Sequence, residues 1–162
     1  MIKNRPGFTL VELLIVIAII GLLATITLVF FGNTRYKARD IKRKFDIGQV
    51  GKFLFLGNCY VPISGFGEYD ISVIMTELKT IYPQAQMLPM IKDPKTGTDT
   101  ESMYRYQVTA TDKCIIYANL ENKEEAITLS GMVAPEAGRG TGVLIGSSTG
   151  VNGTNIYYQF GK

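Results

Sequence analysis

Histidine is absent from this chain of 162 residues, and cysteine occurs only twice. The absence of histidine removes the commonest general base and the commonest metal ligand of enzymes. The sequence also contains no phosphate-binding glycine loop, no metal-binding cluster and no nucleophile–base pair. These absences argue against an enzyme, and we predict that the protein uses no cofactor.

An excess of charge of one sign is also missing. The chain has 17 basic and 14 acidic side chains, so its formal net charge is only +3 at pH 7. This balance argues against a general nucleic-acid-binding protein. With 46% hydrophobic residues the composition does not suggest disorder, and the length suits one domain with an appended element.

One long stretch lacks charge altogether. From Leu13 to Phe31 the chain has 19 residues without a charged side chain, or about 28 Å of helix at about 1.5 Å per residue. The hydrocarbon core of a bilayer is about 30 Å thick, so we predict a membrane-spanning helix. An ordinary secretory signal is shorter and has small residues after its apolar region, whereas here the small residue, Gly7, comes before it.

The segment from Phe8 to about Leu56 is typical of one long helix. Its first half is apolar all round. In its second half apolar residues recur at spacings of three and four, as on one face of a helix, and Gly57-Asn58 is a stop signal. We predict that this apolar face packs on the rest of the domain; its residues are Ala38, Ile41, Phe45, Gln49, Phe53 and Leu56.

A second helix is predicted over 71–81, where five apolar residues share a face. Strands are predicted at MYRYQVT (103–109) and CIIYANLE (114–121), which alternate with a period of two and are joined by the turn-like ATDK. EEAITLSGMV (124–133) is a candidate third strand, and the glycine-rich tail holds the short pieces VLI and NIYYQF. The fold class is therefore α+β: a long N-terminal helix packed by its amphipathic half on a small antiparallel sheet.

Glu12 is the one acid near the start of the apolar segment. Insertion stays favourable, because the 14 Leu, Ile, Val and Phe residues from Leu13 to Phe31 contribute about −4 to −8 kcal/mol against about +3 kcal/mol for the acid. A charge at the border of the acyl region nevertheless gains from a partner. Glu12 either faces headgroup water or pairs with a positive charge of another molecule.

The sequence RPGFTLVELLIVIAIIGLLATI resembles the class III signal of type IV prepilins and related pseudopilins. A short basic leader is followed by Gly, Phe, three apolar or hydroxyl residues, Glu and a long apolar helix. The resemblance implies cleavage between Gly7 and Phe8 by a prepilin peptidase and methylation of the new Phe8 amine. It also implies that Glu12 pairs with the Phe8 amine of a neighbouring subunit during filament assembly.

By this resemblance the chain has four parts: a leader (1–7), a transmembrane and filament-core helix (8–31), the amphipathic half of the helix (32–57) and a globular pilin head (58–162). Its implied function is that of a structural subunit of an extracellular type IV pilus-like filament. The implied partners are identical or related pilin subunits, prepilin peptidase, an inner-membrane assembly platform and, before assembly, membrane lipid. The chain would first span the inner membrane once, with its head outside the cytoplasm.

Two alternatives stay open. The first is a pseudopilin of a type II secretion system, which length does not distinguish from a pilin, although the glycine-rich tail favours a pilus. The second is a membrane-anchored binding domain that does not polymerise, with Glu12 merely at the membrane border.

The basic residues conflict with the orientation that the resemblance implies. Two of them precede the span, whereas six follow it within the next 13 residues, and the positive-inside rule alone would place that second group in the cytoplasm. Contact with anionic headgroups before assembly is one explanation, and a DNA-binding groove along the filament is a second, weaker one. The six residues are Arg35, Lys37, Arg39, Lys42, Arg43 and Lys44.

The remaining candidate sites lie after the helix. Cys59 and Cys114 fit either a disulfide or two buried thiols by count alone; in an exported head we predict the disulfide. Asp93, Asp99 and Glu101 are weak calcium candidates, because oxygen-rich loops can hold calcium, and a structural turn at Asp93-Pro94 is the alternative. Asn152-Gly153-Thr154 (residues 152–154) matches the glycosylation pattern, which often arises by chance.

Overall fold

The structure is a computed structural model that describes residues 7–162, apart from the side chains of residues 28–33 and of Met87. Residues 1–6, which make up most of the expected leader, lie outside the described residues. The chain divides into two units, Met1–Tyr36 and Lys37–Lys162. Helix α1 (Leu10–Leu54) contributes to both units, so each unit is described by itself.

The described part of helix α1 in unit 1 is largely apolar, and most of its side chains are exposed. The segment Leu10–Thr27 has a mean hydropathy of 2.7, none of it is buried, and among the described residues it alone is long and apolar enough to cross a membrane. The hydroxyls of Thr25 and Thr27 donate to the carbonyls of Leu22 (2.7 Å) and Leu23 (3.1 Å). Because these polar groups are satisfied within the helix, they add little cost to insertion in lipid.

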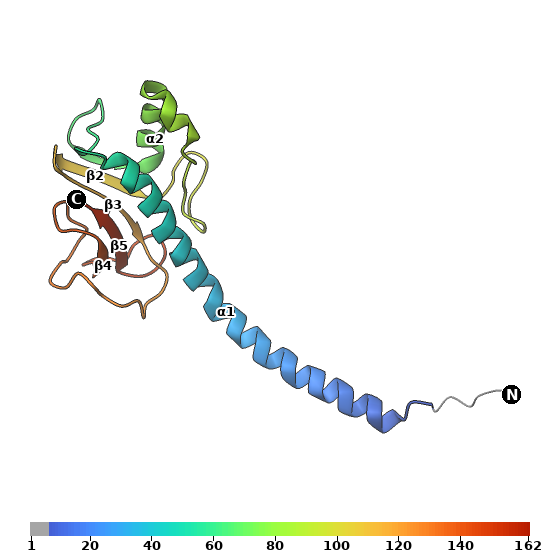
Figure 1. Ribbon diagram of the computed structural model, residues 1–162. Coiled ribbons are helices and arrows are strands. Elements are labelled where there is room, and N and C mark those ends of the chain that lie inside the picture. Colours follow the sequence, from blue (N-terminus) through green and yellow to red (C-terminus); the bar gives the residue numbers. More distant parts are fainter. Residues whose placement is uncertain (1–6) are drawn as a thin grey trace. The chain divides into compact units, whose positions relative to one another are not determined.

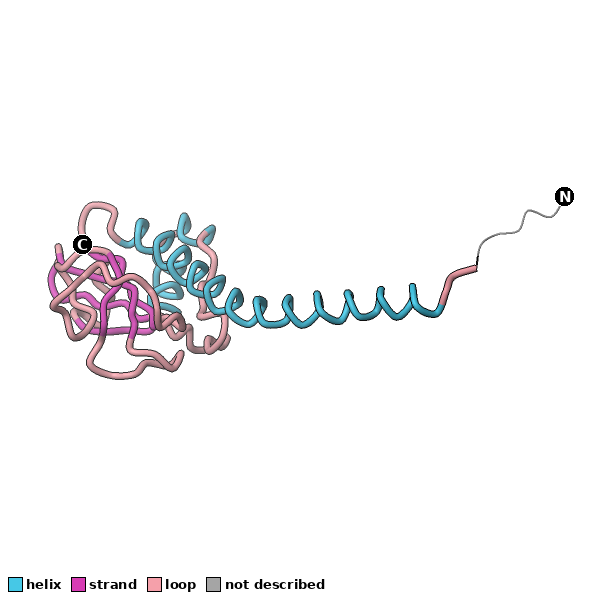
Figure 2. Tube along the Cα trace, turned by 90° about the horizontal axis from the view of Figure 1, so that it is seen from below, coloured by secondary structure: helices cyan, strands magenta, loops and turns pink. Residues whose placement is uncertain are grey.

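Unit 2 contains a five-stranded antiparallel sheet with the order β1-β2-β3-β5-β4. Figure 2 shows the helices gathered on one side of the strands. The glycine-rich tail is part of this sheet, because it supplies both β4 and β5. The elements after α1 are β1 (Gly67–Asp70), α2 (Ile71–Ile81), the 3-10 helix η1 (Pro83–Met87), β2 (Arg105–Ala110), β3 (Lys113–Asn119), β4 (Gly142–Ile145) and β5 (Ile156–Gly161).

The core of unit 2 lies between the sheet and the two helices. From α1 it takes Ile47, Val50 and Leu54, which are almost completely buried. Gly51 lets the helix approach the sheet, since a Cβ there would lie 2.4 Å from the ring of Phe160. Much of the rest of the core comes from α2, β2, β3 and the residue before β2: Ile71, Ile74, Met75, Leu78, Tyr104, Tyr106, Val108, Cys114, Ile116 and Ala118.

Asp70 organises the junction of β1, α2 and β2. Its carboxylate accepts the backbone N–H of Ser72 at 2.8 Å and so caps α2. It also accepts the N–H groups of Ser102 at 3.1 Å and Met103 at 3.2 Å. Met103 has φ 64°, a left-handed conformation that costs a non-glycine residue about 1–2 kcal/mol. The three hydrogen bonds to one side chain hold this strained turn in place.

The α+β architecture confirms the fold class predicted from the sequence, and α2 occupies the predicted range 71–81. The strands predicted at 103–109 and 114–121 are confirmed as β2 and β3, within two residues at each end. The third strand at 124–133 is wrong, because this segment is a loop whose Thr128 and Leu129 N–H groups both donate to the carbonyl of Val143. Strand β1 was not predicted, since GEYD is short and poor in strand-forming residues.

The predicted packing face of α1 is also wrong. Ile41 is 68% exposed, Phe45 61% and Leu56 74%, whereas Arg43 is completely buried. The helix turns a face that contains Asp40, Arg43 and Ile47 toward the sheet instead. The periodicity identified an apolar face of the helix, but the core of unit 2 is built from a different face, which contains Ile47, Val50 and Leu54.

Candidate assembly site

The start of α1 is closed by a reciprocal pair of hydrogen bonds between Thr9 and Glu12. The Thr9 backbone N–H and hydroxyl both donate to Glu12 Oε2, at 2.9 and 2.7 Å. The Glu12 N–H donates in turn to the Thr9 hydroxyl at 3.3 Å. This arrangement is a capping box, which satisfies backbone donors that a helix start leaves without partners.

The capping box gives Glu12 a second role that the sequence analysis did not identify. The signal was present, because Thr-x-x-Glu directly before an apolar helix is the sequence signature of this motif. Gly7 and Phe8 lie before the helix, and the Phe8 side chain is 74% exposed. A carboxylate at this position can therefore serve its own helix, a cation of another molecule, or both, since it offers two oxygens and several lone pairs.

A cluster of buried charges forms the second notable feature, inside unit 2. Arg43 is 0% exposed and meets carboxylates on three sides. Its Nε and Nη2 donate to the two oxygens of Asp93 at 2.7 and 2.9 Å. Its Nη1 lies 2.6 Å from Asp40 and 2.8 Å from Glu121. The cluster ties α1 to two distant loops, one at Asp93 and one that follows β3.

Each carboxylate of the cluster has further partners. Asp40 accepts the backbone N–H groups of Glu121 and Asn122. Burial alone would raise the pKa of Asp93, but hydrogen bonds from Arg43 and from backbone and side-chain N–H groups outweigh it and hold that pKa well below its usual range. The guanidinium of Arg39, 2.6 Å from Glu121, lowers the pKa of Glu121 to about 2. Asp93 and Glu121 are therefore ionised at neutral pH.

The same contacts change the interpretation of the basic residues after the span. Arg39, Lys42, Arg43 and Lys44 all pair with carboxylates of unit 2, Lys42 with Asp46 and Lys44 with Glu125. Four of the six cations after the span are thus paired within unit 2. This leaves less unpaired positive charge for DNA or headgroups than the count suggested.

The three weak calcium candidates do not converge. Asp93 is fully engaged by Arg43, and its carbonyl accepts the N–H of Gly97 at 3.0 Å, as in a structural turn. Asp99 pairs with Lys92 at 2.6 Å, and Glu101 pairs with Arg105 at 3.1 Å. Among the described residues no group of three His, Cys, Asp or Glu side chains could hold a metal ion.

The glycosylation pattern at 152–154 lies in the interior. Asn152 is 6% exposed, and its Nδ2 donates to Asp93 Oδ2 and to the Asn119 carbonyl, both at 2.9 Å. Both amide hydrogens are used, so the folded head does not present this nitrogen for modification. The pattern is better explained as part of the buried polar network.

Cys59 and Cys114 form a disulfide with a Cα–Cα distance of 5.9 Å. The bond joins the segment just after α1 to the start of β3 and lies in the core. It closes a loop with a sequence separation of 55, for which the chain-entropy model gives a stabilisation of about 4 kcal/mol.

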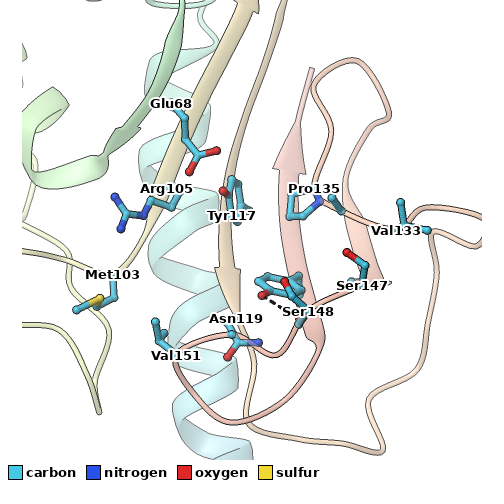
Figure 3. A pocket seen from close by; sticks show the side chains of 14 residues that line it. Glu68, Met103, Arg105, Tyr117, Asn119, Val133, Pro135, Ser147, Ser148 and Val151 are labelled. Carbon is cyan, nitrogen blue, oxygen red and sulfur yellow. Dashed lines mark hydrogen bonds between the residues drawn. The ribbon is translucent and has the colours of Figure 1, made fainter.

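A cavity of about 300 Å³ opens on the face of the sheet away from the helices. Figure 3 shows Glu68, Arg105 and Tyr117 on the strands, with Ser147 and Ser148 on the loop beside them. Burial, together with the nearby Glu68 carboxylate, raises the pKa of Tyr117. The raised pKa keeps the Tyr117 hydroxyl protonated at neutral pH, so this group is a hydrogen-bond donor in the cavity.

These features define a class of protein that has an α+β domain, a disulfide and an apolar helix that begins at a capped acid. A family model described as the prokaryotic N-terminal methylation motif matches residues 2–28. No curated protein and no solved structure matches the chain. The chain carries the class III signal of the type IV pilin and pseudopilin family and has a pilin-like α+β fold, and proteins of this family are structural and not enzymes.

Proposed function

We propose that this protein is a structural subunit of an extracellular type IV pilus-like filament. Prepilin peptidase cuts between Gly7 and Phe8, the Phe8 amine is methylated, and subunits leave the inner membrane through an assembly platform. The parts of the chain are then a leader (1–7), a filament-core helix (8–31), the amphipathic half (32–57) and the head (58–162).

The observation that supports this proposal is the Glu12 carboxylate in the first turn of an apolar helix whose side chains are exposed. None of Leu10–Thr27 is buried by the residues that the structure describes, so it needs lipid or other helices around it. A carboxylate and an ammonium about 4 Å apart gain about 4 kcal/mol at an effective dielectric constant near 20. Glu12 therefore sets the register between neighbouring helices, while apolar packing supplies the adhesion.

A membrane-anchored domain that does not polymerise is the second candidate. The capping box favours it, because the hydrogen bonds from Thr9 give Glu12 a purely structural reason to be there. The two candidates assign different roles to Glu12. Capping needs only an oxygen acceptor, whereas pairing with an amine of a neighbouring subunit needs a negative charge.

Glu12→Gln separates the two roles, since glutamine also closes a capping box but carries no charge. We expect this variant to insert in the membrane and to keep its disulfide, while filament yield falls by at least about tenfold, the effect of losing about 1.4 kcal/mol per contact. Thr9→Ala is the matched control, because it removes the cap, keeps the charge and should still give filaments. Filaments from Glu12→Gln at the wild-type yield would contradict the pairing role of Glu12, whereas a wild-type chain that forms no filaments would favour the anchored domain.

The processing step has a direct test. The mature protein should begin at Phe8 and be heavier than the unmodified sequence by one methyl group, measured by N-terminal sequencing and intact mass. A mature chain that keeps its first seven residues would contradict the proposal.

A further inference from the structure

The outer face of α1 in unit 2 carries apolar side chains that the head does not cover. Ala38, Ile41 and Phe45, which we name the outer stripe, are spaced three and four residues apart and so lie along one line of the helix. Ile41 is 68% exposed and Phe45 61% exposed. A row of large exposed apolar side chains on a soluble head is typical of an interaction surface.

The outer stripe stays exposed because Arg43, on the opposite face of the helix, is held by its buried ion pairs. A rotation of α1 that buried Phe45 would withdraw Arg43 from Asp93 and would leave three carboxylates without their cation. A buried charge without a partner is more costly than an exposed phenylalanine. The stripe therefore needs a partner from outside this head.

A preformed apolar groove lies near the end of the same helix. This distal groove has a volume of about 500 Å³. Its wall at Tyr60 is held by a hydrogen bond from the Tyr60 hydroxyl to Glu77 at 2.5 Å and by one from the Tyr106 hydroxyl to the Tyr60 carbonyl at 2.5 Å. The groove is lined by Phe53, Leu54, Leu56, Asn58, Cys59, Tyr60, Val61, Leu78, Tyr82 and Thr111.

We propose that Phe45 of one copy of this chain inserts into the distal groove of a second copy. The inference rests on the proposed function, in which identical helices run parallel in a filament. The stripe and the groove are continuous with each other on one helix, because Phe53 and Leu56 continue the line of the stripe and also line the groove. An aromatic side chain is a typical anchor for an apolar pocket of this kind.

The distance along the helix between Phe45 and the groove is compatible with contact between two parallel copies. Phe45 and Leu56 are eleven residues apart in the sequence, or about 16 Å along a helix, whereas Glu12 and Phe8 are four residues apart, or about 6 Å. Relative to one subunit, the copy that supplies Phe8 to its Glu12 and the copy that supplies Phe45 to its groove are displaced in the same direction along the filament. The groove contact therefore joins a subunit to a more distant neighbour than the Glu12 contact does, about two or three steps along the filament.

Two different surfaces of one chain are used, so the contact is heterologous. A heterologous contact that does not close into a ring repeats without limit and gives an open helical polymer. The head thereby adds a second set of contacts to those of the apolar helix, and this set specifies which neighbours meet.

Photo-cross-linking in assembled filaments tests the inference. The full-length chain is expressed with its assembly machinery and p-benzoylphenylalanine replaces Phe45. Irradiation should give cross-linked dimers, and mass spectrometry should place the second attachment within residues 53–61 or at Tyr82. The matched control carries the same group at Val133, which is 70% exposed on a loop beside β4 and should give no attachment in the groove.

A charge exchange provides a second test. Phe45→Glu and Leu56→Lys should each lower filament yield by at least tenfold, with the disulfide and protein level unchanged, and the double variant should recover most of the yield. Filaments whose Phe45 cross-links lie outside the groove, or full yield from Phe45→Glu, would overturn this inference and leave the proposed function intact. A wild-type chain that forms no filaments would instead overturn the proposed function.

Discussion

Helix α1 passes through both units, and its side chains meet opposite conditions in each. In Leu10–Thr27 the side chains are apolar and exposed. In the part from Lys37 to Leu54 the helix buries Asp40, Arg43 and Asp46. Apolar character and burial are normally linked, yet along this helix the most apolar part is the least covered.

The difference shows that each part of α1 is adapted to a different surrounding. The first part is stable only where lipid or other helices cover it, so its burial does not occur within one chain. The second part meets loops that supply carboxylates and backbone N–H groups, and these replace water around Arg43 and Asp40. The following predictions test this contrast, from the largest expected effect to the smallest.

Arg43→Ala should have the largest effect. It leaves Asp40, Asp93 and Glu121 buried without their shared cation, which should lower the free energy of unfolding by about 3–5 kcal/mol. Chemical denaturation of the full chain in detergent measures this loss by near-ultraviolet circular dichroism, since every tyrosine except Tyr36 lies in unit 2. Lys42→Ala removes a largely exposed cation, the partner of Asp46 on the same helix, and should cost less than about 1 kcal/mol; equal losses would contradict the role of the cluster.

Two isoleucines of α1 compare the two units directly. Ile47→Ala should lower the free energy of unfolding of the head by about 2–5 kcal/mol, because Ile47 is 0% exposed in the core. Ile17→Ala should leave that free energy within about 0.5 kcal/mol of wild type, because Ile17 is exposed and belongs to unit 1. The same denaturation measurement serves both, and a similar loss from both variants would show that the two units unfold together.

Acid should weaken the head through Glu121. A glutamate in an unfolded chain has a pKa of about 4.3, whereas the pKa of Glu121 in the fold is about 2. A lowered pKa means that this stabilisation, up to about 3 kcal/mol, is fully present above about pH 4.3 and is lost as pH falls through about 2. Glu121→Gln should flatten the slope of unfolding free energy against pH in this range; an unchanged slope would argue against the assignment.

Much of the fold was predictable because its signals are local. The helix at 71–81 and the strands around 105–110 and 113–119 follow from periodicity within single segments. The candidate site was recognised from the residues around Glu12, although the capping role of Thr9 was missed. The third strand failed because Thr128 and Leu129 hydrogen-bond to β4 from an irregular loop, which alternation alone does not reveal.

The N-terminal signal, the apolar helix and the α+β class could all be predicted without a structure, because each depends on residues adjacent along the chain. The face of α1 that points inward could not, because contacts between distant segments set it. That choice depends on Asp93, 50 residues from Arg43, and on Glu121, 82 residues from Arg39. The spacing of apolar residues shows that a helix has an apolar face, but it does not show which face packs on the rest of the fold. Here the face that contains Arg43 is buried, because distant carboxylates pair with it, and Ile41 and Phe45 remain exposed.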